Sequence, residues 1–179
     1  RPLHAKGWLQ ERIDNMTNRS YHTLWGWKEP NTHIIIERLF KFISGLKFIY
    51  VYRNGLDMAF SKNQNQLKLW GDIFLEQKNT ALSPANSLRY WRLAHQRMLK
   101  LQRRYPDKIY MLDFDKLCMH KESQLKFLFD FVDHGSADLG ASARLIEPPA
   151  SVGRYKKHDL SQFARDDLDF IETVYKVSL

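Results

Sequence analysis

The most constraining stretch of this 179-residue chain is a run of β-branched and aromatic residues that ends at an arginine. Residues Lys47–Tyr52 read KFIYVY, a composition typical of a buried strand. Arg53 stands where this strand runs out, and the turn pair Asn54-Gly55 follows it. Ligands of open α/β sheets bind beyond the carboxyl ends of the strands. An arginine placed there, with the hydroxyl of Ser61 on the next helix, suits a dianionic phosphate group.

Helices and strands are expected to alternate along the chain. Apolar residues at helical spacing predict a helix from Pro30 to about Gly45 and another from Gly55 to about Gln66, and Ile109–Leu112 reads as a second strand. The other expected elements are helices at residues 3–19, 84–104, 121–132 and 161–177, a short strand at 24–28, a polar stretch at 63–71 that leads into a surface excursion through residue 80, and a long connection at 135–158. Strands joined through helices imply a parallel sheet with right-handed crossovers.

Charge and cysteine content narrow the function classes. The chain has 28 Lys and Arg against 20 Asp and Glu, a net charge of +8 that favours a polyanionic partner or ligand. The basic residues are spread out and no helix-turn-helix or RNA-binding aromatic signature accompanies them, so no nucleic-acid partner is expected. The single cysteine, Cys118, excludes an intrachain disulfide framework and a cysteine-based zinc site. No apolar run approaches the roughly 20 residues of a membrane span, and we expect a cytoplasmic location.

Several familiar sites have no counterpart in the sequence. There is no G-x-x-x-x-G-K-[ST] and no G-x-G-x-x-G, so no glycine-rich phosphate cradle is present. There is also no H-E-x-x-H, and the 7 histidines show no ligand spacing, so no metal site is expected.

One motif remains: Arg53-x-x-x-Asp57-x-x-x-Ser61, downstream of Lys28-Glu29-Pro30. This arrangement resembles the sulfotransferases that use 3'-phosphoadenosine 5'-phosphosulfate (PAPS), above all their bacterial and protein-tyrosine branches. The resemblance implies that Arg53 and Ser61 bind the 3'-phosphate of the donor, and that Lys28 is catalytic, close to the transferring sulfuryl group. Asp57, one helical turn before Ser61, is expected to fix backbone or arginine geometry.

Two later segments extend the resemblance. Residues 109–117 (IYMLDFDKL) are similar to the family's strand that ends in an aromatic-acidic pair, with Phe114 in the place of an adenine contact. Residues 151–155 (SVGRY) are similar to the late loop that closes over the nucleotide, which implies that Ser151, Gly153 and Arg154 bind it. The donor is then PAPS and the product 3'-phosphoadenosine 5'-phosphate (PAP), with no metal.

Purely structural roles for the same residues stay open. An arginine that ends a buried strand often only pairs with a carboxylate. Lys28 could form a surface ion pair with Glu29 or Glu37, and Phe114 could belong to the core.

The resemblance also implies the fold. We expect an α/β, three-layer α/β/α arrangement with a central parallel sheet, similar to P-loop nucleoside triphosphate hydrolases, in a single domain over residues 1–179. The family's first phosphate-binding loop has no counterpart here, and the chain starts at Arg1. We therefore expect the N-terminal part of the domain, and with it the catalytic base, to be missing from this chain.

The predicted function is transfer of a sulfuryl group from PAPS to a hydroxyl or amine acceptor. The acceptor could be a small molecule, a carbohydrate, a lipid or a peptide. A P-loop kinase-like phosphotransferase and a non-enzymatic nucleotide- or nucleic-acid-binding module are the alternatives.

Overall fold

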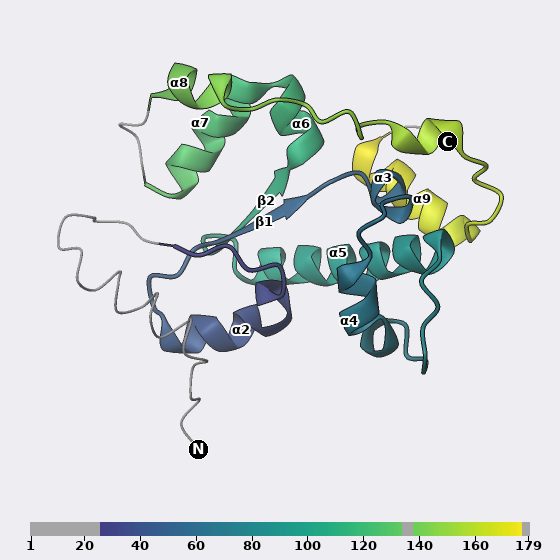
Figure 1. Ribbon diagram of the computed structural model, residues 1–179. Coiled ribbons are helices and arrows are strands. Elements are labelled where there is room, and N and C mark those ends of the chain that lie inside the picture. Colours follow the sequence, from purple (N-terminus) through teal and green to yellow (C-terminus); the bar gives the residue numbers. More distant parts are fainter. Residues whose placement is uncertain (1–25, 134–137, 177–179) are drawn as a thin grey trace. The chain divides into compact units, whose positions relative to one another are not determined.

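The computed structural model describes residues 26–133 and 138–176 (Figure 1). The chain divides into two compact units, residues 1–30 and residues 31–179. In the first unit, the described residues 26–29 form no helix or strand. The second unit contains, in order, α2 (Thr32–Phe42), β1 (Phe48–Tyr52), α3 (Gly55–Ala59), α4 (Asn65–Phe74), α5 (Pro84–Arg104), β2 (Ile109–Asp113), α6 (Phe114–Met119), α7 (Lys121–Phe131), α8 (Leu139–Arg144), the 3₁₀ helix η1 (Arg154–Lys157) and α9 (Arg165–Tyr175). The helix predicted at residues 3–19 lies outside the described residues.

The two strands pair in parallel, from Phe48 opposite Ile109 to Tyr52 opposite Asp113. Helices α3, α4 and α5 lie between them in the chain and supply the long crossover that parallel strands require. The prediction of a mixed α/β chain with a parallel sheet is therefore confirmed for these strands. The short strand predicted at residues 24–28 is wrong where it is described, because residues 26–28 are irregular. The larger three-layer arrangement and the single-domain boundary stay predictions.

Helices cover both faces of the β1–β2 pair (Figure 1). Phe48 and Tyr50 of β1 pack into a cluster with residues of α2 and α5, including Ile36 and Met98. Ile49, which points the other way because side chains alternate along a strand, packs with residues of α6, α7 and α8. The strand pair is thereby packed on both faces. Among the described residues, no helix is both long and apolar enough to span a bilayer.

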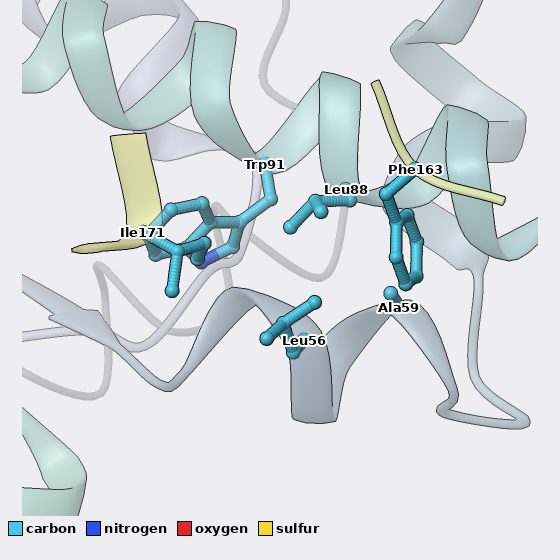
Figure 2. Packing of buried hydrophobic residues seen from close by; sticks show 6 residues of the cluster. All are labelled: Leu56, Ala59, Leu88, Trp91, Phe163 and Ile171. Atoms are coloured by element: carbon cyan, nitrogen blue, oxygen red, sulfur yellow. The ribbon is translucent and has the colours of Figure 1, made fainter. Parts of the chain in front are cut away.

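A third cluster holds the turn after β1 in place (Figure 2). It joins α3, α5, α9 and the segment before α9 through the buried side chains of Leu56, Ala59, Leu88, Trp91, Phe163 and Ile171. Asn54 caps α3, because its side-chain oxygen accepts from the amide nitrogens of Leu56 at 2.9 Å and of Asp57 at 3.4 Å. The residues that follow the strand are therefore held by both core packing and a helix cap.

The helix predicted from Gly55 to Gln66 is two helices, α3 and α4, with an irregular link between them. The side chain of Gln64 explains the break. Its Nε2 donates to the carbonyl oxygens of Met58, Ala59 and Ser61 at 3.1, 3.3 and 2.7 Å, so it satisfies carbonyls at the end of α3. The polar stretch predicted at residues 63–71 is mostly helical, because α4 begins at Asn65 and ends at Phe74. The surface excursion that was predicted to follow it is present over residues 75–80, which are irregular and mostly exposed.

Of the two later helices with a predicted N-terminal cap, one begins where the sequence pattern places it and one does not. Helix α5 begins at Pro84 as predicted, with the hydroxyl of Ser83 accepting from the Asn86 amide at 3.2 Å. The last helix was predicted to be capped by Ser161, but α9 begins at Arg165. Ser161 instead forms a local turn, in which its amide and hydroxyl donate to the Asp159 carboxylate at 2.9 and 2.6 Å.

Replacing Gly55 by alanine tests the close approach of α3 to α5. A Cβ at this position would lie 2.7 Å from two ring atoms of Trp91 and 2.8 Å from Cδ1 of Ile171. We expect Gly55→Ala to lower the free energy of unfolding by about 1–3 kcal/mol, because overpacking outweighs the better helix propensity of alanine. A Cβ at Gly45 would meet nothing within 4 Å, so Gly45→Ala is the matched control and should change stability by at most about 0.5 kcal/mol. Equal urea midpoints for the two variants would contradict this packing.

Candidate functional site

Arg53 lies directly after β1 and is held from several directions. Its carbonyl oxygen accepts a hydrogen bond from Nε1 of Trp91 at 3.1 Å. Its Nη1 donates to Oγ of Ser151 at 3.1 Å, and its Nε lies 3.7 Å from Oδ1 of Asp115. The guanidinium carbon lies 5.5 Å from the centre of the Phe114 ring. Arg53, Phe114 and Ser151, three of the predicted site residues, are therefore brought together.

The Arg53 guanidinium has donor capacity that the described residues do not use. Nε and Nη2 are buried and have no hydrogen-bond partner among the described residues, although the side chain as a whole is 25% exposed. The nearest carboxylate oxygen, Oδ1 of Asp115, also has no hydrogen-bond partner there, because 3.7 Å is too long for one. Buried donors without acceptors are costly. The exposed quarter of the side chain is the part within reach of an external anion.

Two aspartates, Asp113 and Asp115, lie at the end of β2, beside the end of β1. Asp113 caps α6 by accepting from the amides of Asp115 and Lys116 at 3.0 and 3.1 Å, and burial raises its pKa. Asp115 accepts from the Asn54 amide at 2.7 Å through Oδ2. The carboxyl ends of the two strands are thus tied together by a side chain of one and the backbone of the other.

Ser61 lies after α3, contrary to the prediction that it stands on a helix. Helix α3 ends at Ala59 because Gln64 takes over its last carbonyl groups. The Ser61 hydroxyl accepts from the Asn63 amide at 3.2 Å, and the residue is partly buried. Its role at the 3'-phosphate stays a prediction.

The late loop, residues 151–158, runs along α3. Gly153 has a left-handed backbone with φ +74°, and its amide donates to Oδ2 of Asp57 at 2.7 Å. The amide of Tyr155 donates to Oδ1 of the same carboxylate at 3.1 Å, and Nη1 of Arg154 donates to the Phe60 carbonyl at 3.2 Å. Asp57 therefore fixes backbone, one of the two roles that the sequence leaves open for it. The predicted residues Gly153 and Arg154 contact Asp57 and Phe60, and Ser151 of the same loop contacts Arg53.

Lys28, the predicted catalytic residue, belongs to the unit of residues 1–30 and is exposed. Its place at the reaction centre stays a prediction.

Two site residues carry contacts that the sequence did not predict. Asp115 forms the ion pair with Arg53, and Trp91 fixes the arginine backbone from α5. For Asp115 a signal was available, since it stands two positions after β2 as Arg53 stands just after the neighbouring β1. Trp91 offered none, because a tryptophan in the apolar stripe of a long helix indicates only core packing.

An aromatic cage lies beside the arginine. The ring of His95 stacks on Trp91 at 4.8 Å between centroids, and meets Tyr52 edge-on at 4.5 Å and Phe170 at 5.9 Å. The residue is 1% exposed, and its Nδ1 is buried without a hydrogen-bond partner among the described residues. Burial lowers the pKa of His95 to about 4. The imidazole is therefore neutral at pH 7 and serves as an aromatic packing element.

Comparison with known proteins bears on the class of this site. A family model described as the sulfotransferase family matches residues 2–137, which is well over half of the chain. The chain therefore belongs to the sulfotransferase family. No curated protein and no solved structure matches it. The matched region includes Lys28, Arg53, Ser61 and Phe114, whereas the late loop lies beyond it.

The titration of His95 makes stability depend on pH. Its pKa is about 4 in the folded chain against 6.5 when unperturbed, so only the unfolded state binds this proton as the pH falls from about 6.5 to about 4. Stability is fully present above this window and is lost through it, by about 3 kcal/mol in total. His95→Phe keeps an aromatic ring and should remove this component from urea unfolding measured at pH 7 and pH 4.

His120→Gln is the matched control, because His120 is exposed. This variant should keep the pH dependence of the unsubstituted chain. Identical pH dependences for His95→Phe and the unsubstituted chain would contradict a buried neutral imidazole.

Proposed function

We propose that this chain is a PAPS-dependent sulfotransferase domain that transfers a sulfuryl group to a hydroxyl or amine acceptor. Family membership supports sulfotransfer. The observation that carries the donor assignment is Arg53, whose buried Nε and Nη2 have no hydrogen-bond acceptor among the described residues. We include in this proposal the three-layer P-loop-like fold and the single domain over residues 1–179.

Arg53 is the proposed anchor of the donor's 3'-phosphate. A guanidinium presents a planar fork of donors that matches phosphate oxygens, and each charge-assisted hydrogen bond contributes roughly 1.5–3 kcal/mol. The ion pair with Asp115 orients the fork without consuming it, because the pair is 3.7 Å long and not hydrogen bonded. A purely structural role, in which the arginine only neutralises a carboxylate, leaves the unpartnered Nε and Nη2 donors unexplained.

The other predicted residues surround the same nucleotide in this proposal. Ser61 offers a hydroxyl to the 3'-phosphate, and Phe114 offers a partly buried ring to the adenine. Ser151, Gly153 and Arg154 come from the loop that already contacts Arg53 and α3. The late loop is therefore part of the same proposed nucleotide site as Arg53.

Lys28 is the proposed catalytic cation. PAPS, when bound, supplies the sulfuryl group as an activated phosphosulfate. The Lys28 ammonium is a compact point charge on a flexible stem, suited to stabilising negative charge on sulfuryl oxygens in the transition state.

Nucleotide titration tests the donor assignment. PAP should bind this chain more tightly than AMP, which lacks the 3'-phosphate, and Arg53→Ala should weaken PAP binding by roughly 10-fold or more while leaving AMP binding unchanged. Arg53→Lys keeps the charge but loses the fork, so it should fall between the two. The control is Arg104→Ala, since the Arg104 side chain is 70% exposed at the end of α5. Equal affinities for PAP and AMP, or an Arg53→Ala variant with unchanged PAP affinity, would overturn the assignment.

The Ser61 hydroxyl should matter less than the arginine. A neutral hydrogen bond contributes about 0.5–1.5 kcal/mol, so Ser61→Ala should weaken PAP binding by roughly 2- to 12-fold in the same titration. Ser123→Ala is the matched control, because this exposed serine on α7 bonds only the His120 carbonyl among the described residues. If both serine variants bound PAP equally, Ser61 would have no place at the phosphate.

A further inference from the structure

We infer that Asp57 is the positioning residue of this site: it latches the late loop, residues 151–158, onto α3 and so fixes the loop's groups around Arg53. The inference rests on the proposed function only where it names the nucleotide. Asp57 acts through the loop and is not assigned a contact with the donor.

The latch joins segments far apart in the chain. Asp57 stands in the first turn of α3 and is 3% exposed. Oδ2 accepts from the Gly153 amide at 2.7 Å, and Oδ1 accepts from the Tyr155 amide at 3.1 Å. Both carboxylate oxygens are therefore committed to backbone of the late loop.

The loop is shaped to receive a carboxylate. Gly153 adopts the left-handed conformation with φ +74°, and η1 begins immediately after it. The amides of Gly153 and Tyr155 face the Asp57 carboxylate, while the Arg154 amide between them donates to the Ser151 carbonyl at 3.4 Å. These two alternate amides form a backbone cradle for an anion. Asp57 fills this cradle with its own side chain. The amides of Gly153 and Tyr155 are thereby used for holding the loop.

Contacts on either side of the latch align the loop with Arg53. Ser151, before the cradle, accepts from Nη1 of Arg53 at 3.1 Å. Arg154, within it, donates to the Phe60 carbonyl at 3.2 Å, and the ring of His158 after it stacks on Phe60 at 3.9 Å between centroids. The buried carboxylate makes two bonds in the middle of this series, and charge-assisted hydrogen bonds are the strong ones. Loss of Asp57 should therefore release Ser151 and Arg154 together.

Amide hydrogen exchange and PAP titration on the whole chain test the latch. In Asp57→Ala the amides of Gly153 and Tyr155 should exchange at least about 10-fold faster, and PAP affinity should fall by about 10-fold. Asp57→Asn keeps the volume but has one acceptor oxygen, so one of the two amides should lose protection even if Asp57→Ala fails to fold. Asp130→Asn, an exposed carboxylate on α7, is the matched control and should change neither measurement.

A double-substitution comparison separates positioning from simple destabilisation. If Asp57 acts by placing the loop, Ser151→Ala should weaken PAP binding in the unsubstituted chain but hardly at all in Asp57→Asn. Additive effects, or fast exchange of both amides with unchanged PAP affinity, would overturn the positioning role. Failure of the unsubstituted chain to bind PAP would instead overturn the proposed donor, and the exchange rates would still decide whether Asp57 holds the loop.

Discussion

The site depends on one constraint, the burial of the Arg53 guanidinium at the carboxyl end of β1. A buried cation without partners is costly. In this fold the Arg53 guanidinium forms an ion pair with Asp115 and donates a hydrogen bond to Ser151. Asp115 can reach it because β1 and β2 pair in parallel with Tyr52 opposite Asp113, which brings both carboxyl ends to one edge. The register of the sheet therefore determines both the ion pair and the position of the candidate phosphate site.

Helix α3 makes this arrangement rigid although it is only 5 residues long. Leu56 and Ala59 bury one side of it against α5 and α9, while Asp57 on another side holds the late loop. Gly55 allows the close approach to Trp91, which in turn donates to the Arg53 carbonyl. Core packing and candidate binding site are thus coupled through the same few residues.

Local patterns in the sequence were enough to predict β1, β2, α5 and α7, because hydrophobic periodicity and capping residues act over short distances. Ser61 was misplaced because the end of α3 is decided by the side chain of Gln64, which no periodicity reveals. The Arg53–Ser151 and Asp57–Gly153 contacts join residues 98 and 96 positions apart in the chain. Family resemblance implied only that Arg53, Ser151 and Gly153 bind one nucleotide, and no pattern in the sequence predicted that Asp57 contacts the late loop. The ion pair with Asp115 followed from strand register, which the sequence alone did not fix.

A crystal structure of the chain with PAP would test the central claim most directly. We predict the 3'-phosphate within hydrogen-bonding distance of the Arg53 guanidinium, with the amides of Gly153 and Tyr155 still bound to Asp57. A nucleotide bound with its 3'-phosphate away from Arg53, on side chains unrelated to the ends of β1 and β2, would contradict the account.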